Sequence, residues 1–135
     1  CNPAVDAAQA GLVIALDTGP EALAGSTRLK AGTATKMALN MISTGAMALA
    51  GYVYKGMMTH MQPANAKLRR RAARILATLA GIPEQTAKSL LREAEWRIPV
   101  AVIMAVKGAD ARMAETLLHR AGGCLRDALQ SLPPE

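Results

Sequence analysis

Residues 37–54 read MALNMISTGAMALAGYVY, a stretch of eighteen residues without a charged side chain. Alanine, leucine and methionine favour helices, and glycine is a common helix stop, as at Gly51. The pattern predicts one long helix that begins between about Leu29 and Thr33 and ends at Ala50. Apolar residues line two faces of this helix, so we expect it to be packed between other elements.

The same stretch has about the minimum length of a membrane-spanning helix. It also contains Asn40, Ser43 and Thr44 and is rich in alanine, which makes its hydropathy weak for lipid. We therefore predict a buried helix of a soluble domain or dimer, and no contact with a membrane.

An apolar run lies upstream of the helix. Residues 11–17 read GLVIALD, and Gly19-Pro20 follows. The short length and the Gly-Pro punctuation predict a buried strand, and continuous apolarity is typical of parallel sheets that are covered on both faces. Residues 1–3 resemble the end of an earlier strand and residues 4–10 a short helix, so the region reads as a fragment of a β-α-β unit.

The second half of the chain has the patterns of shorter helices. Downstream of Pro63, apolar residues recur at helical spacing up to Gly81, with arginines on the opposite face; the apolar positions are Leu68, Ala72, Ile75 and Leu79. Three short helices are predicted after it. Pro83 and Pro99 suit helix starts, Asp110 is a good N-cap for residues 111–121, and one last turn covers residues 124–129. A boundary near Gly81 would divide the chain into residues 1–81 and a helical bundle over residues 82–135.

The composition excludes several protein classes. The chain has 135 residues, 51% of them apolar and 19% charged, which argues against disorder. Two cysteines, 11 glycines and 7 prolines exclude disulfide-dense and collagen-like scaffolds, and an aromatic content of 2% argues against an all-β sandwich. Cys1 and Cys124 have no metal-ligand or redox spacing, so a reducing cytoplasm is the simplest compartment. We expect a mostly helical domain, alone or with a small appendage.

The net charge is +6, and most of the excess lies in the second half. Its densest run is residues 67–71, KLRRR, with Arg74 one turn further on. The run could be a phosphate-binding patch for nucleic acid, or a solvated helix face. No aromatic residues are interleaved to stack bases, so we favour the solvated face and predict no nucleic-acid partner.

Residues 19–36 read GPEALAGSTRLKAGTATK, and composition alone does not account for them. The segment offers hydroxyls, cations and glycines close to the start of the long helix. Helix N-termini present free N–H groups and a partial positive charge, so this segment could hold a phosphate or sugar hydroxyls. Alternatively, Ser26 and Thr27 could merely cap the helix.

This segment closely resembles the signature that N-acetylmuramic acid 6-phosphate etherases share with the glucokinase regulatory protein. Further matches are to the bacterial etherases: LNM and STG within residues 39–45, Met57-Met58, NAKLR at residues 65–69 and AGGCLR at residues 121–126. The resemblance covers essentially the whole chain and implies the C-terminal half of an etherase. The start at Cys1 rather than at a methionine agrees with this expectation.

The resemblance implies a cytoplasmic lyase of cell-wall sugar recycling. Such an enzyme splits the D-lactyl ether of N-acetylmuramic acid 6-phosphate into N-acetylglucosamine 6-phosphate and D-lactate, by elimination and then addition of water. It works as a homodimer without a metal or organic cofactor. The implied fold is mostly α with a residual α/β part: the end of a sugar isomerase (SIS) parallel-sheet domain, then a ubiquitin-associated-like three-helix bundle. A runner-up interpretation is a sugar-phosphate sensor like the regulatory protein, and a third is a basic nucleic-acid-binding protein.

The family's acid/base glutamates and phosphate-binding loops are expected upstream of this chain, so no catalytic residue is assigned and the isolated chain is predicted to be inactive and to self-associate. The substrate-binding candidates lie in the signature segment: Glu21, Ser26, Thr27, Arg28 and Lys30. Glu21 could touch substrate or anchor the loop, Lys30 could form a salt bridge, and Arg28 could lie at a dimer interface. His60 and Asn65 are either structural or delivered to a neighbouring subunit's site. His119 is expected at the surface, Trp96 in the bundle, and the methionines in packing.

Overall fold

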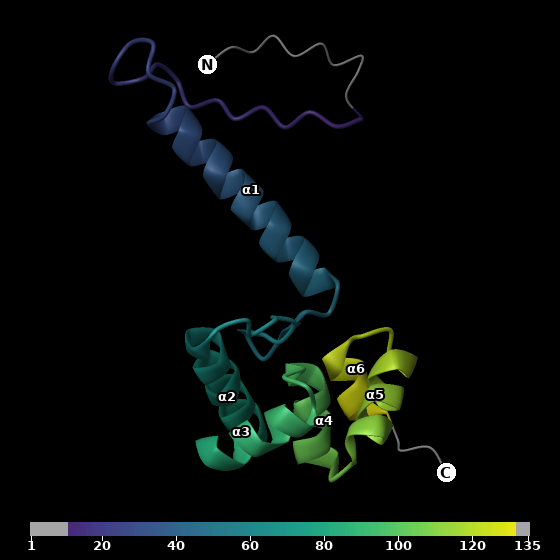
Figure 1. Cartoon of the computed structure of the whole chain (residues 1–135). Helices are drawn as coiled ribbons and strands as arrows, with labels where there is room; N and C mark the ends of the chain where they lie inside the picture. The colour runs from purple at the N-terminus through teal and green to yellow at the C-terminus, as the bar shows by residue number, and fades with distance from the viewer. Residues whose placement is uncertain (1–10, 132–135) are drawn as a thin grey trace. The chain divides into compact units, whose positions relative to one another are not determined.

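The computed structural model describes residues 11–131, and the structure is mostly helical (Figure 1). The elements in chain order are α1 (Lys30–Leu49), β1 (Val53–Tyr54), β2 (Met57–Met58), α2 (Ala66–Ala80), α3 (Glu84–Glu93), α4 (Ile98–Lys107), α5 (Ala111–Arg120) and α6 (Leu125–Gln130). The chain forms two compact units that divide between Ala46 and Met47. The expectation of a mostly helical chain is confirmed.

The long helix is also confirmed, because α1 begins at Lys30 and ends at Leu49. Gly51 follows with a φ of 79°, a left-handed conformation that is unfavourable for other residues. A β-carbon at Gly51 would lie 3.0 Å from the Cys124 β-carbon, so glycine is also needed for the close approach of these two turns. The expected burial of α1 is not found: none of its residues is buried. An apolar helix face is buried only by a packing partner, and the described chain provides none for α1.

The predicted buried strand over residues 11–17 is wrong for this structure. The segment has no regular secondary structure, and its side chains are exposed, with Leu12 at 81% and Ile14 at 56%. A strand needs a neighbour to pair its backbone N–H and C=O groups, and within residues 11–131 no segment pairs with it. The features predicted for residues 1–3 and 4–10 lie outside the described residues.

The sheet of the described chain is a short hairpin that the sequence analysis did not predict. β1 and β2 pair antiparallel, with Val53 opposite Met58 and Tyr54 opposite Met57. Lys55 and Gly56 form the two-residue turn, and both have positive φ, 47° and 74°. Two consecutive residues with positive φ are typical of a type I′ hairpin turn.

The core of the second unit is built around α4, which contacts α2, α3, α5 and α6. Every residue of α4 from Ile98 to Met104 is buried. A strand would expose alternate side chains unless covered on both faces, whereas helices on several sides bury a helix that is apolar all round. The prediction of a helix that starts near Pro99 is confirmed.

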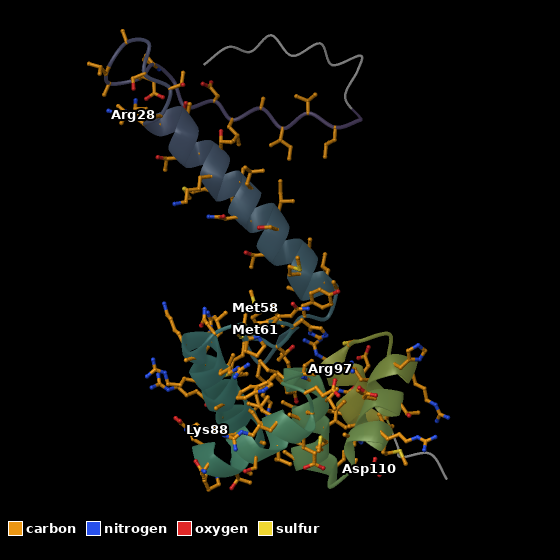
Figure 2. The ribbon with its side chains drawn as sticks, viewed as in Figure 1. Arg28, Met58, Met61, Lys88, Arg97 and Asp110 are labelled. Carbon is orange, nitrogen blue, oxygen red and sulfur yellow. The ribbon has the colours of Figure 1, made fainter. Side chains whose placement is uncertain are left out.

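The ends of α2 and α5 show why the sequence predicts these helices well. Asn65 caps α2, since its side-chain oxygen accepts a hydrogen bond from Leu68 N at 2.9 Å. Gly81 ends the same helix with a φ of 67°, as is common for a C-terminal glycine. Asp110 caps α5 as Asn65 caps α2, accepting from Met113 N at 2.7 Å (Figure 2). These contacts assign Asn65 a structural role in α2.

The predicted domain boundary near residue 81 stays a prediction. In the structure, α2 packs against α3 and α4 and belongs to the same compact unit as the later helices. Compactness reports which elements touch in this chain. Contacts within this chain do not define the boundaries of a larger domain. The division between Ala46 and Met47 therefore leaves the predicted boundary near residue 81 untested.

Candidate functional site

The Glu21 carboxylate occupies the N-terminus of α1. Its Oε2 atom accepts a hydrogen bond from Lys30 N and its Oε1 atom accepts one from Ala31 N, both at 3.0 Å. The hydrogen bond from Ala31, followed by that from Lys30, holds the pKa of Glu21 below its usual value of 4.5. Glu21 is therefore ionised at neutral pH and complements the positive end of the helix. An external anion cannot use these two N–H donors while Glu21 holds them.

The loop that joins Glu21 to α1 is ordered by backbone contacts. Ser26 N donates to Leu23 O at 3.1 Å, and Gly32 N donates to Thr27 O at 2.9 Å. The Lys30 ammonium donates to Pro20 O at 3.0 Å, so it binds the loop and does not form the salt bridge weighed above. Glu21 and Lys30 together anchor both ends of the loop to the helix start.

The loop leaves three of the five candidate residues available. Arg28 is exposed (Figure 2) and has no ion pair or hydrogen bond within residues 11–131. Thr27 is exposed and Ser26 is half-buried. Neither hydroxyl caps α1 in the described structure, because Glu21 has taken that role. The alternative in which Ser26 and Thr27 merely cap the helix is therefore wrong.

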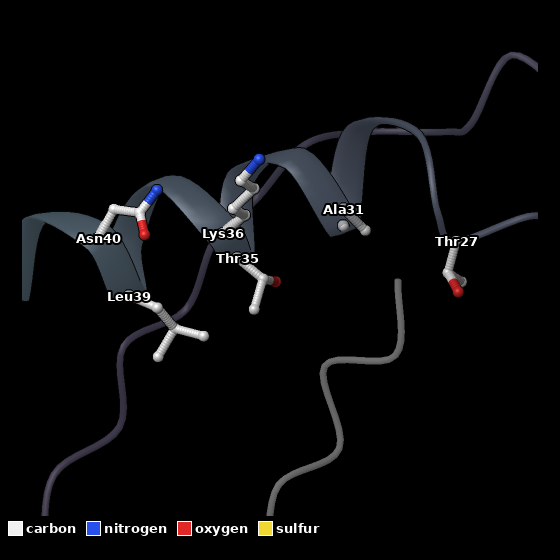
Figure 3. A pocket seen from close by; sticks show the side chains of 7 residues that line it. Thr27, Ala31, Thr35, Lys36, Leu39 and Asn40 are labelled. Carbon is white, nitrogen blue, oxygen red and sulfur yellow. The ribbon is translucent and has the colours of Figure 1, made fainter. Parts of the chain in front are cut away.

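A hollow of about 520 Å³ lies beside the first turns of α1 (Figure 3). It is lined by Thr27, Ala31, Gly32, Thr35, Lys36, Leu39 and Asn40. A β-carbon at Gly32 would lie 3.3 Å from Thr27 O, so glycine allows the loop to approach the helix. Thr35, Lys36 and Asn40, which line this hollow, are not among the binding residues predicted from the sequence. The spacing of four residues from Gly32 to Lys36 and on to Asn40 was a signal, since such residues share a helix face.

His60 belongs to the second unit. Its ring stacks on Tyr52, with the centroids 4.3 Å apart, and its Nδ1 atom lies 3.2 Å from Thr59 Oγ1. A hollow of about 630 Å³ lies here, lined among others by Trp96 and Arg97. Partial burial lowers the pKa of His60 below its usual 6.5 and the Arg97 charge adds to this, while a hydrogen bond with the Gly123 backbone acts in the opposite direction. His60 is therefore mainly neutral at pH 7.

Lowering the pH below 6.5 is expected to destabilise the second unit. The pKa of His60 is lower in the folded chain than its usual 6.5. The unfolded chain therefore binds more protons just below pH 6.5, and the stability present above that pH is lost as the pH falls toward the folded value. Urea unfolding at pH 7.5 and 5.5 would measure the loss in the unchanged chain, in His60→Gln and in His119→Gln. His119 is exposed, as predicted. A pH-dependent loss as large in His60→Gln as in the unchanged chain would contradict the expectation.

Residues 11–131 were compared with the patterns of a metal-binding cluster and of a membrane-spanning helix. Within residues 11–131, no group of three or more His, Cys, Asp or Glu side chains is placed to hold a metal ion. No helix in this part of the chain combines the length and apolar character needed to cross a bilayer. The candidate site consists of the signature loop and the hollow beside α1.

The chain is similar to curated proteins from several Salmonella strains. The N-acetylmuramic acid 6-phosphate etherases of Salmonella paratyphi B, Salmonella schwarzengrund and Salmonella agona are each 46% identical to it over 131 residues. The match covers 96% of this chain and 44% of each relative, so the chain spans less than half the length of these etherases. No family model matches the chain. The resemblance indicated by the signature segment is thereby confirmed: over almost its whole length, the chain is similar to N-acetylmuramic acid 6-phosphate etherases.

Proposed function

We infer that this chain is the C-terminal part of an N-acetylmuramic acid 6-phosphate etherase. The observation that carries this proposal is the 46% identity over 96% of the chain to proteins of that name. The reaction is a carbon–oxygen lyase reaction. A base removes the proton at C2 of the sugar, the C3–O bond to the lactyl group breaks, and an acid protonates the departing oxygen to release D-lactate. Water then adds across the C2–C3 double bond to give N-acetylglucosamine 6-phosphate.

The roles of this chain are substrate binding and packing. The acid and base are expected to be glutamates in the part of the etherases that this chain does not cover, and no metal or organic cofactor is part of the proposal. Within the part of the chain that the structure describes, the side chains of Ser26, Thr27 and Arg28 make no hydrogen bond or ion pair, so their polar groups are available to the substrate. Glu21 and Lys30 hold the loop on α1 and so position the other three. Positioning of this kind contributes strongly to catalysis, since small displacements of binding groups cost rate.

The proposed architecture is the end of a SIS-type parallel-sheet domain over residues 1–81 and a ubiquitin-associated-like bundle over residues 82–135. Two observations support it. Within residues 11–131, residues 11–17 have the apolarity of a parallel strand but no pairing strand. In the same part of the chain, α1 has exposed apolar residues, among them Met37, Met41 and Ile42. Both segments need packing from further chain or from a second subunit. We propose a cytoplasmic homodimer that acts on a phosphosugar and has neither a nucleic-acid nor a membrane partner.

Release of D-lactate tests the function. The 135-residue chain is expected to give no D-lactate above the buffer rate from N-acetylmuramic acid 6-phosphate, because it lacks the acid/base pair. The longest natural polypeptide that contains this sequence is expected to release D-lactate and N-acetylglucosamine 6-phosphate in equal amounts. Turnover by the shorter chain would contradict the placement of the catalytic groups. Binding of phosphosugars without lactate release by the longer polypeptide would favour the sensor instead.

A further inference from the structure

Lys36 is a cation without a counter-charge at the edge of the candidate site. It lies in the second turn of α1, is exposed, and has no ion pair or hydrogen bond within residues 11–131. The ammonium of Lys30 donates to Pro20 O, so the two lysines of this segment differ in what they can bind. Lys36 is the one whose three N–H donors are all available to a ligand.

Lys36 shares its hollow with neutral hydrogen-bonding groups. Asn40 follows one turn later on α1, and Figure 3 shows the Lys36 ammonium and the Asn40 amide projecting from successive turns. Thr35 and Thr27 add hydroxyls to the lining, and the lining contains no acidic side chain. The hollow is an open depression on the surface of the first turns of α1. In Figure 3 the cation and the amide project to the same side of α1 and suit an anionic oxygen group, whereas the side chains of Thr27 and Thr35 project to the other side.

The position of Glu21 directs an anion toward this hollow. The carboxylate of Glu21 already accepts from the N–H groups of Lys30 and Ala31. A ligand anion at the helix end would lose those donors and meet a like charge, which is unfavourable. The side of the helix at Lys36 carries the positive charge without that competitor.

We propose that the hollow beside α1 is an anion subsite, in which Lys36 binds an anionic oxygen group of the phosphosugar and Asn40 donates a hydrogen bond to the same ligand. The assignment rests on the proposed function, because the phosphosugar of the etherases has two such groups, the 6-phosphate and the lactyl carboxylate. Either group presents the same chemistry to an ammonium, and the experiment below distinguishes them.

The test is a binding series on the longest natural polypeptide that contains this sequence. Calorimetric titrations would use N-acetylglucosamine 6-phosphate, which has only the phosphate, N-acetylmuramic acid, which has only the carboxylate, and N-acetylglucosamine, which has neither. Lys36→Met is expected to reduce the binding affinity for one of the two anionic ligands by on the order of tenfold to a hundredfold. This is the usual loss for a hydrogen bond to a charged group. N-acetylglucosamine is expected to bind equally to both proteins.

Three further variants sharpen the result. Lys36→Arg should restore most of the affinity, since it returns the charge. Asn40→Ala should reduce the affinity for the same ligand by a smaller factor. Lys88→Met, which changes a lysine of α3 outside the signature segment, should leave all three affinities unchanged.

The titrations test the anion subsite independently of the proposed etherase reaction. Loss confined to the phosphate ligand, or confined to the carboxylate ligand, supports the subsite and names the group bound. Unchanged affinities in Lys36→Met, equal losses for all three ligands, or no binding of either anionic ligand by the unchanged polypeptide would overturn it. Absence of D-lactate release defeats the proposed function alone, because the titrations measure Lys36 without turnover.

Discussion

Replacing Ile103 with alanine is expected to lower the free energy of unfolding of the second unit by about 2–5 kcal/mol. Ile103 lies in α4, the helix that contacts α2, α3, α5 and α6, and its exposure is 0%. The shorter side chain removes buried apolar atoms and leaves a cavity that surrounding helices fill only partly. Urea denaturation followed by circular dichroism would measure the change.

Val106→Ala is the matched control for this prediction. Val106 lies in the same helix one turn later, and 53% of it is exposed. Its truncation is expected to cost about 1 kcal/mol or less, as for other substitutions at partly exposed positions. Equal losses in the two variants would contradict the placement of α4 at the centre of the core.

Replacing Glu21 with alanine is expected to reduce kcat/KM for lactate release by about a hundredfold, the scale of loss that a small displacement of binding groups produces. The change removes both acceptors that hold the loop on α1, at Lys30 N and Ala31 N. Arg28 and its neighbours then lose their fixed position. The measurement is steady-state kinetics on the longest natural polypeptide that contains this sequence. Glu93→Ala, at an exposed position of α3, is the matched control and should keep normal kinetics.

A second measurement separates the structural role of Glu21 from the proposed reaction. In the 135-residue chain, Glu21→Ala should speed amide hydrogen exchange at Lys30 and Ala31, because both amides lose their acceptor. In the unchanged chain, the pKa of Glu21 is below 4.5. The contribution of this cap is therefore complete above that usual value and is lost as the pH falls through the lower folded value. Unaltered exchange in the variant would contradict the cap.

The helices could be predicted because their signals are local. Gly81 and Asp110 end and start helices through contacts within a few residues, and the structure confirms both of these predicted ends. The apolar period of α2 predicts its buried face for the same reason, since Ala72 and Ile75 recur at helical spacing and lie in the core. Local hydrogen bonds and helical periodicity do not depend on distant parts of the chain.

The site was predictable as a segment but not in its geometry. The pattern of residues 19–36 selected the loop, and its resemblance to the etherases is confirmed. The pattern could not say that Glu21 bonds across nine residues to Lys30 N, or that the Lys30 ammonium turns back to Pro20. Lys36 and Asn40 were not predicted as binding residues, because a polar residue within a helix usually indicates only a face exposed to solvent.

The sequence by itself determined the helices, because their signals are short-range patterns. It also determined the similarity to the etherases, because that similarity depends on residue identities alone. Only the tertiary structure decided which apolar segments are covered. Residues 11–17 and α1 have the composition of buried elements, yet none of their residues is buried, while α4 is buried from Ile98 to Met104. The physical reason is that burial belongs to a pair of surfaces: an apolar face is removed from water only when another surface is placed against it.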